Sequence, residues 1–134
     1  MNLYKNKILK LKLRDNSTQL VKDRIDKSEV ISRTQDGINE VVVYWGLDEM
    51  TELNQIINFN NNNLPSPITK DYDWAGIYKP FKHQRITSEF LSINKRGFCF
   101  NEAGTGKTSS ALWAADYLMN KGKIKRVLII CPLS

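Results

Sequence analysis

The sequence predicts an α/β protein in which a small α+β module precedes the first part of a parallel-sheet lobe. Within residues 7–14, leucines alternate with basic side chains, which is the period-two pattern of a half-buried strand. Residues 98–100 and 127–131 are instead short, continuous apolar runs on either side of a helical pattern, as in buried parallel strands joined by a crossover helix. Of the 134 residues, 41% are hydrophobic and 25% charged, which excludes collagen-like, coiled-coil and wholly disordered chains.

The N-terminal module is predicted from turn and capping signals. Asp36-Gly37 separates two β-rich runs, which is a strong short-range signal of a hairpin. Asp48 can cap a helix in which Met50 and Leu53 recur at helical spacing. The expected elements are a strand over 7–14, a helix over 18–27, strands over 29–33 and 38–45, and a helix over 49–57.

Composition suggests where the units meet. An asparagine-dominated stretch over 58–63 is followed by Leu64-Pro65-Ser66-Pro67, and neither segment favours regular structure. We therefore expect a module over residues 1–63, a linker or aromatic connecting segment over 64–80, and the start of the parallel-sheet lobe over 81–134. The aromatic side chains of the connecting segment are expected to pack over a domain edge.

Charge is distributed unevenly along the chain. Residues 1–35 carry nine Lys and Arg against four acids, residues 36–78 one against seven, and residues 79–134 ten against three. Basic ends are compatible with nucleic acid or nucleotide phosphates as partners, and equally with a solvated basic surface. For the basic side chains of residues 7–14, the solvated face is the favoured interpretation.

The C-terminal lobe is expected to begin with a helix over 81–94, whose apolar face would comprise Phe81, Ile86, Phe90, Leu91 and Ile93. A strand over 98–100, a helix over 107–120 and a strand over 127–131 would then form a βαβ unit.

A phosphate-binding motif occupies the predicted strand-to-helix junction, which reads Asn101-Glu102-Ala103-Gly104-Thr105-Gly106-Lys107-Thr108. Its Gly-Lys-Thr end matches a P-loop, and the motif requires this strand and helix context. Gly104 and Gly106 permit a backbone whose amides converge on one concavity, at which the helix N-terminus adds partial positive charge. We expect Lys107 to contact the β- and γ-phosphates and the Thr108 hydroxyl to ligate Mg²⁺. Asn101 stands where the strict pattern has its first glycine.

The asparagine at position 101 narrows the set of P-loop families that this motif can resemble. The string NEAGTGKT resembles motif I of the Swi/Snf-type helicase-like ATPases of superfamily 2, which tolerate another residue at the first glycine. Residues 80–84, PFKHQ, resemble the family's proline–aromatic–glutamine motif, and residues 127–134 resemble its motif Ia. The resemblance covers about residues 78–134, and the stretch from Trp45 onward is more weakly similar to virus-encoded members. It implies a RecA-like P-loop lobe, ATP and Mg²⁺ as cofactors, and ATP-driven movement along DNA, with double-stranded DNA as the expected partner.

Residue roles follow from this resemblance. The Gln84 amide can donate to adenine N7 and accept from N6, which would distinguish ATP from GTP. His83 is expected to pack or form a hydrogen bond, Glu102 to be solvated, and Phe81 or Tyr78 either to stack on the base or to pack in the core. Lys107 and Thr108 are the expected catalytic pair. The expected nucleotide contacts are Gln84, Glu102, Ala103, Gly104, Thr105, Gly106, Lys107, Thr108 and Ser109, and the expected nucleic-acid contacts are Pro132, Leu133 and Ser134.

The family's Asp-Glu motif and second lobe lie further along the chain than Ser134, so we expect an N-terminal fragment whose partner is the missing C-terminal part of the motor. Loss of an arginine finger alone costs roughly 10³–10⁵-fold in rate, so useful ATP turnover by these residues is not expected. The alternatives are a non-catalytic nucleotide- or DNA-binding module, an RNA helicase or restriction translocase, and an N-terminal unit that only docks proteins.

Cysteine usage and hydropathy indicate the compartment. Cys99 and Cys131 lie within apolar runs and lack metal-ligand spacing, which predicts a reducing, cytoplasmic environment (host cytoplasm if the chain is virus-encoded). No apolar run approaches the roughly 18 residues of a membrane span, and no secretory signal is recognised.

Overall fold

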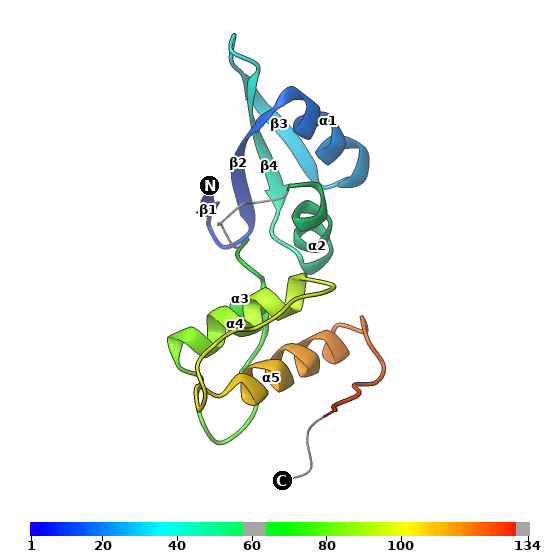
Figure 1. Cartoon of the computed structure of the whole chain (residues 1–134). Coiled ribbons are helices and arrows are strands. Elements are labelled where there is room, and N and C mark those ends of the chain that lie inside the picture. The colour runs from blue at the N-terminus through cyan, green and yellow to red at the C-terminus, as the bar shows by residue number, and fades with distance from the viewer. Residues whose placement is uncertain (58–63, 131–134) are drawn as a thin grey trace.

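The computed structural model describes residues 1–57 and 64–130, which form a mixed α/β structure (Figure 1). Its sheet has four antiparallel strands in the order β1-β2-β4-β3. The elements are β1 (Asn2–Tyr4), β2 (Ile8–Arg14), α1 (Asp15–Arg24), β3 (Ser28–Arg33), β4 (Ile38–Tyr44), α2 (Leu47–Ile56), α3 (Ile68–Asp71), α4 (Lys82–Ile93) and α5 (Lys107–Asn120). Among the described helices, none has the length and apolarity needed to cross a membrane.

The sheet forms as the alternation in the sequence predicts. Leu9 pairs with Val43 and Leu11 with Val41 across β2 and β4, and all four side chains are buried. Figure 1 shows α1 and α2 on the same side of the sheet, and these helices cover that apolar face. The predicted hairpin is also confirmed, since β3 and β4 pair around Gly37, whose positive φ of 70° suits glycine.

Helix α1 begins earlier than the sequence predicted. It spans Asp15–Arg24 rather than 18–27, directly after β2 and without an intervening loop. The acidic Asp15 lies in its first turn, where a negative charge stabilises a helix. Burial of Thr18 and Val21 then sets the inward face of the helix. Helix α2 likewise begins at Leu47, two residues before the predicted start.

The connecting segment contributes to the same core as the sheet. Leu64, Ile68, Tyr72 and Trp74 are buried in the hydrophobic cluster that also contains the β2 leucines. The ring of Tyr72 packs edge-on against Trp74, with centroids 5.6 Å apart, and against Tyr117 of α5 at 6.0 Å. Aromatic packing therefore joins the N-terminal sheet to the α4–α5 pair.

The apolar runs at 98–100 and 127–130 are not strands in the structure, contrary to the sequence prediction. The side chains of Phe98, Phe100, Leu128 and Ile130 are each more than four-fifths exposed. Parallel strands of this type require neighbours and cover on both faces, and the described residues provide neither beside these segments. Cys131, the end of the second predicted strand, lies outside the described residues.

Helix α4 lies within its predicted range, but only part of its predicted apolar face is buried. Ile93 is buried as predicted, whereas Phe81 and Ile86 are exposed and Thr87, Ser88 and Ser92 are buried. The Ser88 hydroxyl donates to the Ser110 carbonyl of α5 at 2.9 Å. The Thr87 and Ser92 hydroxyls donate to backbone carbonyls of α4 itself, so hydrophobic periodicity alone could not identify these packed positions.

Candidate nucleotide-binding site

The glycine-rich loop enters α5 through a left-handed turn. Gly104 and Gly106 have φ values of 75° and 77°, and Gly106 is the N-cap of α5. A Cβ atom at Gly106 would collide with the Gln84 amide, whereas one at Gly104 would meet nothing within 4 Å. Gly106 is therefore required by backbone conformation and by contact, and Gly104 by conformation alone.

The Lys107 ammonium is folded over this loop. Its Nζ donates to the carbonyl oxygens of Asn101 at 2.9 Å and Glu102 at 2.8 Å, and the Thr105 hydroxyl also donates to the Glu102 carbonyl. A lysine cation, a left-handed turn and the N-terminus of a 14-residue helix meet here. This combination fits a phosphate group, because each feature favours negative charge or offers hydrogen-bond donors.

Helix α4 holds the loop through two adjacent side chains. Gln84 Nε2 donates to the Thr105 carbonyl at 3.2 Å, and His83 Nε2 lies 3.0 Å from the same oxygen, which it can reach as a donor. Gln84 Oε1 accepts from the Phe81 amide at 2.9 Å and so helps to cap α4. The sequence placed Gln84 near the P-loop and expected His83 to pack or form a hydrogen bond, and the structure brings both residues to one loop carbonyl.

Asn101 also has a defined place. Its Nδ2 donates to Thr87 Oγ1 of α4 at 2.9 Å. A glycine could not make this bond, so the side chain that departs from the strict P-loop pattern fastens the start of the loop to α4.

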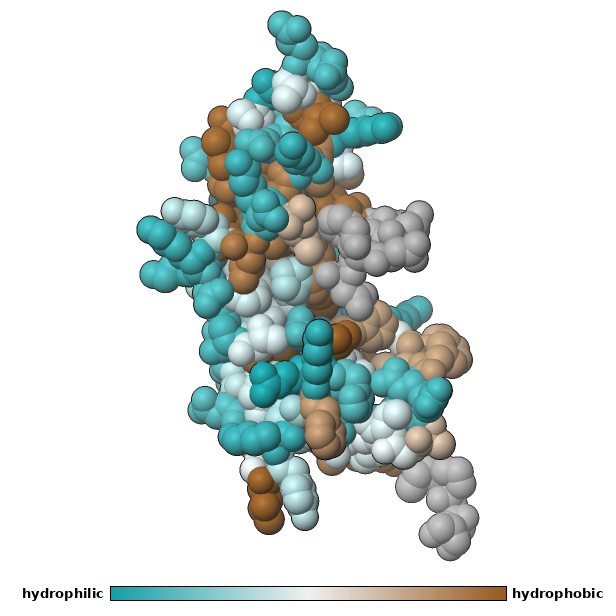
Figure 2. Space-filling view, turned by 90° about the vertical axis from the view of Figure 1, so that its left-hand side faces the viewer, coloured by the Kyte–Doolittle hydropathy of each residue, from teal (hydrophilic) through white to brown (hydrophobic). Residues whose placement is uncertain are grey.

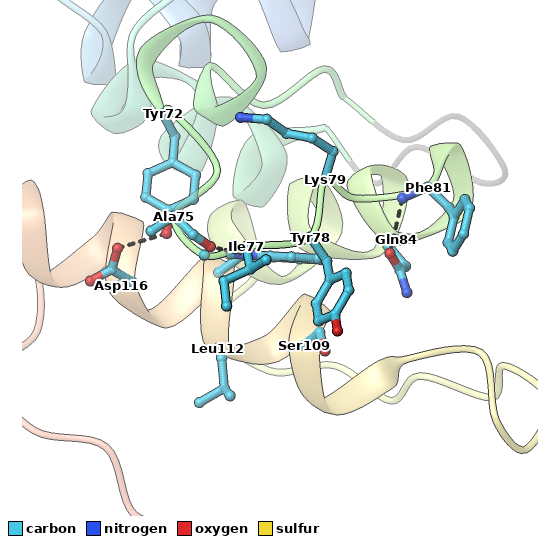
Figure 3. Close-up of a pocket in the computed structure, with 12 residues that line it drawn as sticks. Tyr72, Ala75, Ile77, Tyr78, Lys79, Phe81, Gln84, Ser109, Leu112 and Asp116 are labelled. Carbon is cyan, nitrogen blue, oxygen red and sulfur yellow. Dashed lines mark hydrogen bonds between the residues drawn. The ribbon is translucent and has the colours of Figure 1, made fainter.

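A pocket of about 630 Å³ adjoins the loop (Figure 3). It lies between the connecting segment and one face of α5, and Gln84 and Ser109 are common to the pocket and to the expected nucleotide contacts. The other lining residues are Tyr72, Ala75, Gly76, Ile77, Tyr78, Lys79, Phe81, Leu112, Trp113 and Asp116. A mainly apolar and aromatic lining with a few polar groups suits a flat, partly apolar ligand such as a nucleobase.

Two hydrogen bonds stabilise the walls of this pocket. Trp113 Nε1 donates to the Ala75 carbonyl at 2.7 Å, and the Tyr72 hydroxyl donates to Asp116 Oδ2 at 2.6 Å. Burial, followed by the hydrogen bond to Asp116 and its charge, raises the pKa of Tyr72 to about 12. Tyr72 therefore remains a protonated donor at neutral pH.

The remaining predicted site residues differ in how they are placed. Thr108 and Ser109 lie exposed in the first turn of α5, and Ala103 and the Glu102 side chain are exposed on the loop. Pro132, Leu133 and Ser134 lie outside the described residues. Residues 1–57 and 64–130 contain no cluster of three His, Cys, Asp or Glu side chains placed to hold a metal ion.

Sequence reasoning identified only Ser109 of the α5 wall of the pocket and missed Leu112, Trp113 and Asp116. Ser109, Leu112, Trp113 and Asp116 recur at helical spacing and therefore share one face of α5. That periodicity was available in the sequence. Phe81 and Tyr78, for which core packing was one expectation, are 68% and 81% exposed, so they are not core residues in the structure.

The chain matches no protein-family model, and neither the curated proteins nor the solved structures contain a match to it.

Proposed function

We propose that the chain carries the ATP-binding elements of a Swi/Snf-type superfamily 2 motor that acts on DNA. The observation that carries the proposal is the left-handed turn at Gly106, with the Lys107 ammonium folded over the loop and Gln84 held at its rim. The motif resemblance over residues 78–134 supplies the family and the DNA substrate, and the loop geometry supports the nucleotide.

In the proposed complex, phosphate oxygens replace the Asn101 and Glu102 carbonyls as acceptors for Lys107. This exchange is favourable because hydrogen bonds between an ammonium and a charged acceptor are stronger than those to a neutral carbonyl. The Thr108 hydroxyl would hold Mg²⁺, which supplies charge neutralisation on the phosphates. The N-terminus of α5 faces the same group.

The pocket next to the loop is the proposed place of the adenine base. Gln84 lies between the loop and the pocket, and its amide carries both a donor and an acceptor. Gln84 would have to release the Thr105 carbonyl to read the base, whereas His83 can retain that carbonyl.

The parallel-sheet lobe is part of the same proposal. Residues 98–100 and 127–130 would become strands once further strands and helices cover them, as buried parallel strands require. The C-terminal part of the motor would supply those elements and the remaining catalytic groups, and Pro132, Leu133 and Ser134 would meet the DNA backbone.

The test is a titration of the chain with a fluorescent ATP analogue, in the presence and absence of Mg²⁺. Lys107→Ala is expected to weaken binding by roughly 10- to 100-fold, the equivalent of losing hydrogen bonds to a charged group. Lys125→Ala is the control, because it removes one exposed lysine away from the loop. Equal binding by Lys107→Ala and the unaltered chain would refute the proposed phosphate site.

A second titration tests the base. Gln84→Ala is expected to reduce the preference for ATP over GTP in competition experiments, because the remaining pocket lining provides shape but little hydrogen-bond readout. An unchanged ATP-to-GTP ratio would leave phosphate binding in place and exclude Gln84 as the base reader.

A further inference from the structure

The N-terminal sheet has a second face that α1 and α2 do not cover, and near one end of it Lys70 of α3 lies 6.0 Å from the Tyr44 ring centre. Side chains alternate across a strand, so those between the buried leucines of β2 point away from α1 and α2. In Figure 2, hydrophobic and hydrophilic residues are interspersed over the upper half of the molecule, which the sheet occupies. We call the face of the sheet that points away from α1 and α2 the open face.

A row of three exposed side chains, two tyrosines with an isoleucine between them, crosses the open face. Tyr4 of β1 pairs with Ile8 of β2, and Ile8 pairs with Tyr44 of β4, so the three side chains lie side by side. Their exposed fractions are 61%, 37% and 41%. A lysine accompanies each tyrosine, since Lys5 Nζ lies 5.4 Å from the Tyr4 ring centre and Lys27 Nζ 4.9 Å from that of Tyr44.

A ladder of cations continues from this row along β2. Lys10, Lys12 and Arg14 follow Ile8 at every second position and therefore lie on the same face. Residues two apart along a strand are about 6.7 Å apart, which is close to the separation of successive phosphates in an extended single strand.

Two acids, Glu29 and Glu40, share the open face. Glu40 is already engaged, because it forms an ion pair with Lys10 at 2.9 Å and accepts a hydrogen bond from Ser32 at 3.1 Å. Among the described residues, Lys12 and Arg14 form no ion pair. Arg14 lies opposite Ile38 in the strand register, so its charge is available to an anionic partner, whereas Lys12 lies opposite Glu40 and shares the charge of that carboxylate with Lys10.

We propose that the open face binds single-stranded nucleic acid, with bases stacked on Tyr4 and Tyr44 and phosphates along Lys12 and Arg14. Aromatic platforms beside a basic track are the two features by which proteins bind single strands without reading sequence. A duplex would use the cations but not the tyrosines, because its bases are stacked within the helix. The inference goes beyond the proposed ATP site, from which this surface is separate.

The experiment measures binding of the full chain to a fluorescein-labelled oligothymidylate and to a duplex of equal length by fluorescence anisotropy. The charge-reversed variant is Lys12→Glu with Arg14→Glu. Its matched control is Lys22→Glu with Arg24→Glu, which changes two exposed cations of α1 at the same spacing and leaves the same net charge. Circular dichroism melting of both variants verifies that the fold is retained.

We expect the open-face variant to bind the single strand at least tenfold more weakly than the control variant. The slope of log K against log salt should fall by roughly 1.4, as expected for two lost phosphate contacts. Tyr4→Ala with Tyr44→Ala should weaken single-strand binding by about tenfold or more and leave the weaker duplex binding unchanged.

Three outcomes would overturn the proposal. Equal losses in the two charge-reversed variants would indicate bulk charge, tighter binding of the duplex would remove the role of the bases, and no effect of the tyrosine changes would remove the stacking platform. Lys107→Ala separates this proposal from the ATP site, because it should weaken nucleotide binding and leave oligothymidylate binding intact.

Discussion

The N-terminal sheet and the C-terminal half of the chain, which carries the glycine-rich loop, form their structure by different means. Each strand of the sheet pairs with an antiparallel neighbour, and α1 and α2 bury one face of the sheet. In the C-terminal half, the segments 98–100 and 127–130 have β-type sequences but are exposed and unpaired within the described chain. A hairpin-based sheet can be completed by nearby residues, whereas a parallel sheet requires crossovers and cover on both faces.

The glycine-rich loop is nevertheless held in place without a parallel sheet. Gln84 and His83 of α4 contact the Thr105 carbonyl, and Asn101 contacts Thr87. Side-chain hydrogen bonds with one helix, α4, therefore fix the loop in the absence of a neighbouring strand among the described residues. The comparison predicts that the two halves differ sharply in how they respond to substitution.

The largest expected difference is between Leu9→Ala and Phe100→Ala. Leu9 is fully buried under the helices, so its truncation should lower the free energy of unfolding by about 2–5 kcal/mol. Phe100 is 91% exposed, so its truncation should change the free energy of unfolding by less than about 0.5 kcal/mol. Urea unfolding followed by circular dichroism measures both values. A comparable loss for Phe100→Ala would show that residues 98–100 pack against something in solution.

Gly106→Ala should have the next largest effect, and Gly104→Ala is its control. Both replacements force a side chain into the left-handed region, at a cost of about 1–2 kcal/mol. Only the Cβ at Gly106 also displaces Gln84. The melting temperature of Gly106→Ala should therefore be lower than that of Gly104→Ala. Equal melting temperatures would mean that the contact with Gln84 does not constrain the loop.

The contrast also separates what the sequence could predict from what it could not. The β2 alternation and the Asp36-Gly37 turn identify the sheet, because its periodicity and turn chemistry are local. The same reasoning assigned strands to residues 98–100 and 127–131, since apolar runs report a tendency to be buried but not whether a partner is present. On α4 the burial of Ile93 was predicted, but that of Thr87, Ser88 and Ser92 was missed because hydropathy does not detect such side chains.

The candidate site was predictable in part for a similar reason. The loop glycines and Lys107 form a contiguous motif, and Gln84 was predicted from the resemblance of residues 80–84 to the family's proline–aromatic–glutamine motif. The pocket walls formed by Leu112, Trp113 and Asp116 depend on how α5 lies against the connecting segment, which is a tertiary property. The His83 ring stacks on Phe81, but its contact with the Thr105 carbonyl joins residues far apart in the sequence and required the structure.

Tyr72→Phe should have a smaller effect, of about 1 kcal/mol at neutral pH, through loss of the hydrogen bond to Asp116. The folded pKa of Tyr72 is raised from 10 to about 12, so the associated stability is present below pH 10 and is lost as the pH rises towards 12. The free energy of unfolding of Tyr72→Phe should therefore fall less steeply with pH over that interval than that of the unaltered chain. Tyr78→Phe, at an exposed position, should behave as the unaltered chain. Identical alkaline profiles for Tyr72→Phe and the unaltered chain would contradict the assignment.

The smallest expected effect tests whether charge rather than apolar burial holds the N-terminal sheet. Hydrogen bonds from Lys10 and Ser32, together with the charge of nearby lysines, hold the pKa of Glu40 below its ordinary value of 4.5. A depressed carboxyl pKa stabilises the fold above pH 4.5, and this contribution is lost as the pH falls through the folded pKa. Glu40→Gln should therefore lower stability slightly at neutral pH, and the difference should vanish in acid and shrink with added salt, because the pair is on the surface. Urea unfolding at several pH values measures this difference in the free energy of unfolding between Glu40→Gln and the unaltered chain. A loss as large as that of Leu9→Ala would mean that cross-strand charge pairing, rather than apolar burial, holds β2 to β4.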